Sequence, residues 1–284
     1  MRRTLWIRCA EAVGATARAN PTTTPPPGPG TVDEEEIRKF RALAQRWWDP
    51  KGPLAMLHQM NPTRVHYIQS VVGDIRGKTI LDIGCGGGIL STSLCRLGAQ
   101  VTGIDACPES IAAAQQHQSR HHDLASIQFR CERIESHKGS VEEGYDGLRS
   151  KEGRKEGYDV VVMSEVLEHV PTTHIDAFLD AAVKNVRTDG AVVITTINKT
   201  LLSRLFVVNV AEYMLGIVPP GTHDYEKFLA PEYLTGVLKQ KGLVTTDVRG
   251  IVVFPHLFPE PCLSFALFPA FTEMNYCLAA VKNR

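Results

Sequence analysis

Apolar residues follow two different patterns along most of this chain. Apolar runs of the kind that form buried strands occur at residues 79–83, 100–104, 127–131, 158–163, 191–196, 243–254 and 276–281. Apolar residues recur at helical spacing at residues 32–48, 53–72, 89–97, 110–117, 175–186 and 231–240. Strands that alternate with helices in this way predict an α/β fold, in which a mostly parallel sheet carries helices on both faces.

The N-terminal part of the chain has a different composition. Residues 1–31 contain four arginines but only one acid, with small and apolar residues between them. This composition is typical of a mitochondrial transit peptide, and a disordered tail is the alternative. The stretch TTTPPPGPGT at residues 22–31 cannot form a helix or a strand ladder, which indicates a linker. We therefore expect a transit peptide and linker over residues 1–31 and one folded domain over residues 32–284.

The composition disfavours several classes of protein. Thirty-one lysines and arginines balance 31 aspartates and glutamates, so we expect no nucleic-acid partner. The seven cysteines include no C-x-x-C pair for zinc binding or redox chemistry, which favours a reducing compartment. The sequence contains no uncharged apolar run long enough to cross a membrane.

A glycine-rich loop after the first strand is the clearest candidate for a ligand site. Asp82 lies at the end of that strand, and Gly84 and Gly86 follow in a loop whose backbone can come close to a ligand. A dinucleotide loop would need a third glycine where Ile89 stands, which disfavours an NAD-dependent enzyme. Asp105 ends the second strand, where a carboxylate can bind the two hydroxyls of a ribose. The alternative is that the glycines only turn the chain and that Asp105 caps the next helix.

This loop and the acid at the end of the second strand are similar to those of the Rossmann-like methyltransferase superfamily, which bind S-adenosylmethionine. The resemblance implies an α/β, seven-stranded, mostly parallel sheet with helices on both faces and an antiparallel last strand. It also implies that Gly84 and Gly86 approach the cofactor, that Asp105 binds its ribose, and that Ser164, after the fourth strand, contacts it. Asp82 and Asp105 together would suit the cationic sulfonium and ammonium groups.

The segment SEVLEHV, residues 164–170, carries a second constellation. Helical spacing from Glu165 would place Glu168 and His169 on the same face of a helix. Two carboxylates and one imidazole suit a hard or borderline divalent cation such as Mg²⁺ or Mn²⁺ better than a thiolate-binding metal. A solvated helix face would be the usual explanation of such a pattern, but its position at the carboxyl end of a strand favours a site.

Four segments together resemble one family, the ubiquinone biosynthesis O-methyltransferases, which modify polyprenylated catechols. The segments are RWWDPKGPLAMLHQMNPTRVHYI, SEVLEH, TTINKT and VPPGTHDYEKFLAPEYL, and the resemblance extends over residues 32–253. It implies that Glu165, Glu168 and His169 bind a divalent metal, with magnesium as the expected ion. It also implies that Arg64 helps to hold the carboxylate of S-adenosylmethionine. Between Phe254 and Met274 the chain departs from the family pattern, so the resemblance does not predict which residues form the far wall of the substrate pocket.

The chemistry of such a reaction assigns further roles. A phenol is mostly protonated at neutral pH, so a metal bound to its oxygen would increase the phenolate fraction and orient it toward the methyl group. Glu165 and His169 are therefore candidate catalytic residues. A metal-bound His169 could not act as the base, which makes His223 the candidate for proton removal, with ordinary loop hydrogen bonding as the alternative.

A polyprenylated substrate lies in a bilayer, so the enzyme must approach a membrane. Residues 201–218 are rich in large apolar side chains and could lie in the membrane interface, and a helix that faces the core is the alternative. Together with the transit peptide, this predicts a peripheral protein on the matrix side of the mitochondrial inner membrane. The resemblance also implies a multi-enzyme coenzyme Q biosynthetic complex as a partner.

Three other functions are compatible with parts of this pattern. They are a methyltransferase of a different small molecule, a noncatalytic methyltransferase-like scaffold, and an NAD-dependent dehydrogenase. The intact residues Asp105, Glu165, Glu168 and His169 argue against the scaffold, and Ile89 argues against the dehydrogenase.

Overall fold

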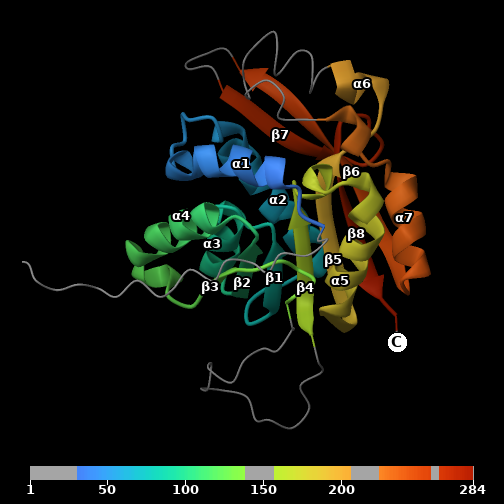
Figure 1. Cartoon of the computed structure of the whole chain (residues 1–284). Coiled ribbons are helices and arrows are strands. Elements are labelled where there is room, and N and C mark those ends of the chain that lie inside the picture. The colour runs from blue at the N-terminus through green and yellow to red at the C-terminus, as the bar shows by residue number, and fades with distance from the viewer. Residues whose placement is uncertain (1–30, 138–156, 206–223, 257–261, 284) are drawn as a thin grey trace, which may run out of the picture.

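The computed structural model describes residues 31–137, 157–205, 224–256 and 262–283. Within these ranges one eight-stranded sheet runs through the molecule in the order β3-β2-β1-β4-β5-β8-β6-β7 (Figure 1). The strands are β1 (Thr79–Ile83), β2 (Gln100–Asp105), β3 (Gln128–Cys131), β4 (Tyr158–Ser164), β5 (Val186–Ile197), β6 (Leu243–His256), β7 (Cys262–Phe268) and β8 (Asn275–Lys282). The first five strands are parallel to one another, whereas β8 is antiparallel to β5 and β6, and β7 is antiparallel to β6.

Helices cover both faces of this sheet. On one face, α5 (Ile175–Lys184) and α7 (Pro231–Gln240) pack on a cluster of buried residues that includes Val161, Ile194 and Leu278. On the other, α2 (Ala55–Val72), α3 (Ile89–Arg96) and α4 (Pro108–Ser119) pack on a second cluster that includes Val160 and Val193. Neighbouring residues of one strand thus point to opposite faces, as the pleat requires. The α/β, mostly parallel architecture expected from the sequence is confirmed.

The helix α1 (Glu34–Leu43) follows from strong local signals. Asp33 caps it by accepting a hydrogen bond from the Glu35 N–H at 2.9 Å, and its first turn carries three glutamates that favour the positive end of the helix. A 3-10 turn, η1 (Ala44–Arg46), continues it. The helix lies across the carboxyl ends of the parallel strands (Figure 1). This placement puts α1 directly above the predicted site.

The structure contains one strand that the sequence pattern did not predict. β7 lies in the segment that departs from the family pattern, and it pairs with the end of β6 from Gly250 to His256. The sequence of this segment, HLFPEPCLSFALFPAFTE, is interrupted by prolines and so gave no clear strand signal. The described sheet therefore has eight strands where seven were expected.

The expected helix at SEVLEHV is wrong. Glu165 has a φ of 55°, in the left-handed region, and only a short 3-10 turn, η3 (Leu167–His169), follows. A left-handed residue breaks the helical spacing, so Glu168 and His169 do not extend from one helix face. Glu168 instead faces β5, and His169 faces α1.

Candidate active site

A cavity of about 730 Å³ lies at the carboxyl ends of β1, β2 and β4. Every predicted site residue in the described ranges lines it: Arg64, Asp82, Gly84, Gly86, Asp105, Ser164, Glu165, Glu168 and His169. The remaining candidate, His223, lies outside the described residues. One continuous cavity thus joins the predicted cofactor residues to the predicted acceptor residues.

The glycine loop and Asp105 form one end of the cavity. Asp105 accepts a hydrogen bond from the Gly86 N–H at 2.9 Å and one from the Cys107 N–H at 2.8 Å. Each carboxylate oxygen is therefore already held by a backbone amide, which fixes its orientation toward the cavity. Asp82 is buried beside it and accepts a hydrogen bond from Ser91 Oγ at 2.5 Å. Burial raises the pKa of Asp82 to about 6, although the hydrogen bond from Ser91 opposes the shift.

The glycines of the loop make room for protein as well as for a ligand. A Cβ on Gly86 would come within 2.3 Å of the Trp47 ring, and one on Gly84 within 2.4 Å of a methyl group of Val166. Trp48 donates a hydrogen bond from Nε1 to the Gly87 carbonyl at 3.0 Å. Trp47 and Trp48, which follow α1, therefore pack directly on the glycine loop. The sequence pattern did not indicate this contact.

Arg64 and Ser164 connect the two ends of the cavity. Arg64 is buried and donates hydrogen bonds to Ser164 Oγ at 3.1 Å and to Asn61 Oδ1 at 3.0 Å, and its Nε has no hydrogen-bond partner among the described residues. Ser164 in turn lies 2.8 Å from Thr195 Oγ1, and Thr195 donates to Glu165 Oε1 at 2.8 Å. Because the one hydroxyl proton of Thr195 goes to Glu165, Ser164 must donate to Thr195. A buried guanidinium with a donor left over suits a carboxylate ligand.

Two acids form the other end of the cavity. Glu168 is 3% exposed and accepts a hydrogen bond from Thr196 Oγ1 at 2.8 Å. Burial and the nearby charge of Glu165 raise the pKa of Glu168 well above its ordinary value. Thr195 and Thr196 come from β5, and their role in holding these acids was not apparent from the sequence. Two carboxyl groups forced together in a buried place favour either a shared proton or a cation.

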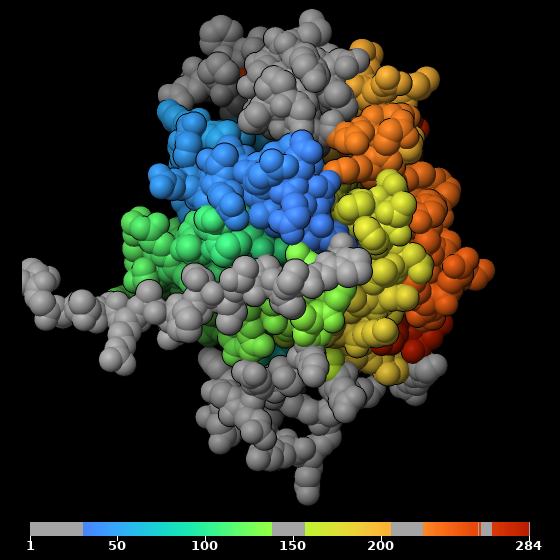
Figure 2. Space-filling model, in the orientation of Figure 1, coloured from blue at the N-terminus to red at the C-terminus, as the bar shows by residue number. Residues whose placement is uncertain are grey.

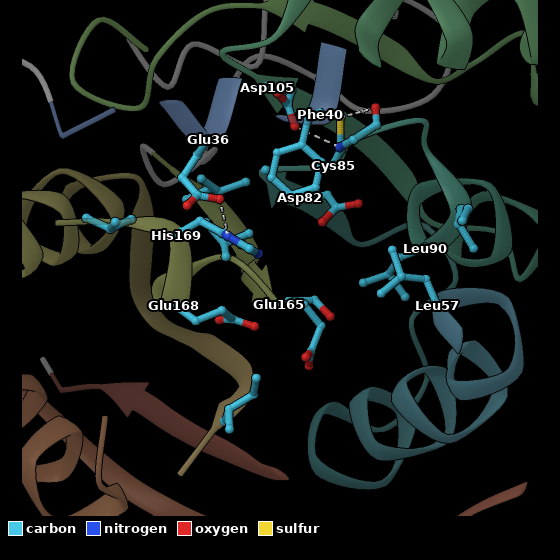
Figure 3. Close-up of a pocket in the computed structure, with 18 of the residues that line it drawn as sticks. Glu36, Phe40, Leu57, Asp82, Cys85, Leu90, Asp105, Glu165, Glu168 and His169 are labelled. Carbon is cyan, nitrogen blue, oxygen red and sulfur yellow. Dashed lines mark hydrogen bonds and ion pairs between the residues drawn. The ribbon is translucent and has the colours of Figure 1, made fainter. Parts of the chain in front are cut away.

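His169 lies beside these acids and is held by α1. Its Nδ1 is 2.9 Å from Glu36 Oε2, and its ring meets the Phe40 ring edge to face at a centroid distance of 5.0 Å. Figure 3 shows Glu36 on one side of His169, with Glu165 and Glu168 on the other. Burial alone would raise the pKa of Glu36, but the hydrogen bonds from His169 and Lys39, together with the charge of Lys227, lower it to about 2. The sequence pattern placed Glu36 only within the predicted helix at residues 32–48.

The side chains of Glu165, Glu168 and His169 offer the kinds of donor atom that a divalent cation binds, but they are not arranged as one ligand set in the described structure. In the part of the chain that the structure describes, no three or more His, Cys, Asp or Glu side chains are arranged to hold a metal ion. Glu165 and Glu168 bring two oxygen donors to one buried place, where a cation would offset their repulsion. His169 uses Nδ1 for Glu36, which leaves Nε2 as its remaining ligand atom.

Known proteins match both the sequence and the fold. The model of a methyltransferase domain family matches residues 56–248. The ubiquinone biosynthesis O-methyltransferase of Neisseria meningitidis serogroup C is 39% identical over 249 residues, which cover 87% of this chain and 95% of that protein. The mitochondrial ubiquinone biosynthesis O-methyltransferase of Mus musculus is 38% identical over 264 residues, which cover 89% of this chain and 66% of that protein.

A solved structure has the same fold. The magnesium protoporphyrin IX methyltransferase from Synechocystis PCC 6803, crystallised with bound SAH, has a TM-score of 0.56 and 18% identity and covers 88% of this chain and 94% of that chain. The fold, the glycine loop and the acid that ends β2 define an S-adenosylmethionine-dependent methyltransferase. Within this class, the chain belongs to the family of ubiquinone biosynthesis O-methyltransferases.

Proposed function

We propose that this enzyme transfers a methyl group from S-adenosylmethionine to a phenolic hydroxyl of polyprenylated catechols in ubiquinone biosynthesis. The substrates would be 3,4-dihydroxy-5-polyprenylbenzoate and demethylubiquinol. The observation that carries this proposal is the continuity of the cavity, which runs from the glycine loop through the buried acid pair to an apolar wall. The names of the relatives support the pathway.

The cofactor would bind at the glycine loop, and four residues would hold it. Asp105 would bind the ribose, and Arg64, through its unpartnered Nε, would bind the carboxylate of the methionine part. Ser164 and Asp82 would lie close to the cationic groups. In-line transfer from a sulfonium needs mainly proximity and alignment, which a rigid loop provides.

The catechol would bind at the acid pair. We propose that Glu165, Glu168 and Nε2 of His169 hold a divalent cation, with Mg²⁺ as the expected ion. Such a cation lowers the pKa of a bound phenol and so supplies a better nucleophile at neutral pH. Thr195 and Thr196 keep the two carboxylates directed into the cavity. His223 stays the candidate for the general base.

The prenyl tail of the bound catechol would extend along the apolar wall of the cavity that β7 and the end of β6 provide. Val252 and Val253 of β6, Leu263 and Phe265 of β7, and Phe271 all line the cavity. An apolar surface of this kind suits a hydrocarbon chain, because each buried methylene contributes about 0.8 kcal/mol. The segment that departs from the family pattern would therefore set the shape of the tail site.

We further propose a mitochondrial location, at the matrix face of the inner membrane, after removal of a transit peptide within residues 1–31. The mitochondrial relative in Mus musculus supports this location. Within the described ranges no helix is long and apolar enough to cross a bilayer. Leu201 and Leu205 are 79% and 49% exposed, which favours interfacial contact over core packing for the described part of residues 201–218. A biosynthetic complex would be the partner.

One assay tests the central proposal. Purified protein is mixed with labelled S-adenosylmethionine, Mg²⁺ and a prenylated dihydroxybenzoate, with and without EDTA. We expect label in the phenolic ether, and loss of transfer in EDTA with recovery on added Mg²⁺. Cofactor binding without transfer to any prenylated catechol would favour the noncatalytic scaffold, and full activity in EDTA would remove the metal from the mechanism.

Membrane contact has a separate test. The double change Leu201→Glu, Leu205→Glu should reduce co-sedimentation with anionic liposomes and leave methylation of a water-soluble catechol unchanged. Binding equal to that of the unchanged protein would show that these side chains do not reach the bilayer.

A further inference from the structure

The helix α1 touches both ends of the cavity. Figure 2 shows its blue residues lying across this face, between the green segments around α4 and the yellow and orange segments opposite. After the helix, Trp47 packs on the glycine loop, and Phe40 stacks on Trp47 at a centroid distance of 6.3 Å. Phe40 also contacts the ring of His169. A continuous row of rings therefore runs from the cofactor loop to the acceptor site.

Glu36 is the polar residue of this helix that reaches the acceptor site. It is 7% exposed, and its Oε2 binds His169 while its Oε1 accepts hydrogen bonds from Lys39 at 3.1 Å and Lys227 at 3.3 Å. Lys227 also binds Asp33 at 2.9 Å, which fastens the start of the helix. Glu36 is thus held in place by two cations while it contacts a single imidazole.

The chemistry of this contact determines the state of the imidazole. An ionised carboxylate only accepts hydrogen bonds, so His169 must carry a proton on Nδ1. In the neutral ring Nε2 then has a lone pair, the form in which histidine binds a metal or accepts a proton. Without the carboxylate, the ring could rotate or adopt the other tautomer.

We propose that Glu36 is a positioning residue for methyl transfer: it holds His169 with Nε2 free to act, and it does so from the helix that closes over the cofactor loop. This inference rests on the proposed function, in which His169 belongs to the acceptor site. The acceptor site is then complete only while α1 is docked, so the helix couples cofactor enclosure to activation of the phenol.

The test compares two changes of the same kind in the same helical turn. Glu36→Gln keeps the size of the side chain but removes the charge that fixes the tautomer. Glu35→Gln removes an equal charge from an exposed position in the first turn, so it controls for the helix dipole. For both proteins we would measure kcat, the KM and Kd for S-adenosylmethionine, and the His169 tautomer from ¹⁵N shifts of labelled imidazole. His169→Gln assigns the signal.

We expect Glu36→Gln to lower kcat about 10-fold to 100-fold, as for other residues that orient a catalytic or metal-bound histidine. The KM and Kd for S-adenosylmethionine should stay within about twofold, because the helix and Trp47 remain docked. The ¹⁵N shifts of metal-free Glu36→Gln should show that His169 no longer adopts the Nδ1–H tautomer alone. Because this measurement needs neither metal nor turnover, it is independent of activity. Glu35→Gln should change none of these quantities.

The outcomes separate this inference from the proposed function. If the unchanged protein methylates a catechol and Glu36→Gln matches it in kcat and tautomer, Glu36 has no positioning role. If kcat falls only together with a higher Kd for S-adenosylmethionine, Glu36 merely docks the helix, and the inference is overturned. If the wild-type protein methylates no catechol, the proposed function is contradicted instead. The tautomer measurement then still decides whether Glu36 positions His169.

Discussion

The two ends of the cavity are built in different ways. The cofactor end comes largely from one stretch of chain, from Asp82 to Cys107, where a strand, a loop, a helix and a second strand follow in order. The acceptor end combines the turn after β4, hydroxyls of β5, the helix α1 and the β6–β7 hairpin. A local unit keeps a recognisable spacing, whereas the contacts that complete a composite site, such as that of Glu36 with His169, join segments with no fixed spacing.

This difference between the two ends predicts that cofactor binding and methyl transfer can be impaired separately. The cofactor end presents backbone amides and a carboxylate already fixed by them, so it should bind its ligand without help from the other end. The acceptor end depends on contacts between segments far apart in the chain, such as that of Glu36 with His169. Changes at the acceptor end should therefore impair reaction while cofactor affinity persists. The predictions below test this separation.

The largest effect is expected at Glu165. Glu165→Ala removes one of the two carboxylates that would hold the cation, and should lower kcat on the order of 10² to 10³-fold, the usual cost of removing one electrostatic stabiliser. Calorimetry should give an unchanged Kd for S-adenosylmethionine. Glu226→Ala, which removes an exposed carboxylate that binds Lys199 at the surface, is the control. A parallel loss of cofactor affinity would mean that the two ends are not separable.

A change of pH should act on the cofactor end through Asp82. Its pKa is raised to about 6 in the folded protein, because burial disfavours the charge. Its favourable contribution to folding is therefore complete below the ordinary pKa near 3.8 and is lost as the pH rises through 6. Asp82→Asn cannot ionise, so its unfolding free energy should not show this loss. The difference in unfolding free energy between Asp82→Asn and the wild type should therefore shift in favour of the variant by up to about 3 kcal/mol from pH 4 to pH 7. Urea unfolding at both pH values measures this, and a constant difference contradicts it.

The contact between the two ends should be sensitive to Gly86. Gly86→Ala would place a Cβ 2.3 Å from Trp47 at a φ of 54°, so it adds a clash to backbone strain. We expect a loss of about 2 kcal/mol in stability together with a lower kcat, because the helix α1 must shift. Gly242 also has a positive φ, of 81°, and a Cβ there would meet no atom of the described residues within 4 Å, so Gly242→Ala controls for strain alone. Equal thermal shifts for the two variants would show that Trp47 accommodates the methyl group.

The smallest effect is expected at Asp105. Asp105→Asn keeps the shape of the side chain but replaces a charged acceptor, so the affinity for S-adenosylmethionine should fall about tenfold, or about 1.4 kcal/mol. The kcat at saturating cofactor should change little. Isothermal titration and steady-state kinetics together measure both quantities. A large fall in kcat with unchanged affinity would place Asp105 in the reaction instead.

The sequence predicted most of the fold because the signals are local. β1 and α7 have the predicted bounds, since an apolar run ended by glycines and a proline at a helix start act within a few residues. β7 was missed, because its residues form a strand only by pairing with β6. The helix expected at residues 164–170 was wrong, because the left-handed conformation of Glu165 depends on its surroundings.

By itself, the sequence determined the class of enzyme, and it predicted the glycine loop as the cofactor site and Glu165 and Glu168 as the acids of the acceptor site. These features depend on residue types at short spacing, which the chain carries whatever its tertiary contacts. Tertiary structure alone decided that Glu36 holds His169, that Trp47 rests on the glycine loop, and that Thr195 and Thr196 hold the two acids. Each of these contacts joins segments that only the packed sheet and the helix above it bring within hydrogen-bond or van der Waals distance.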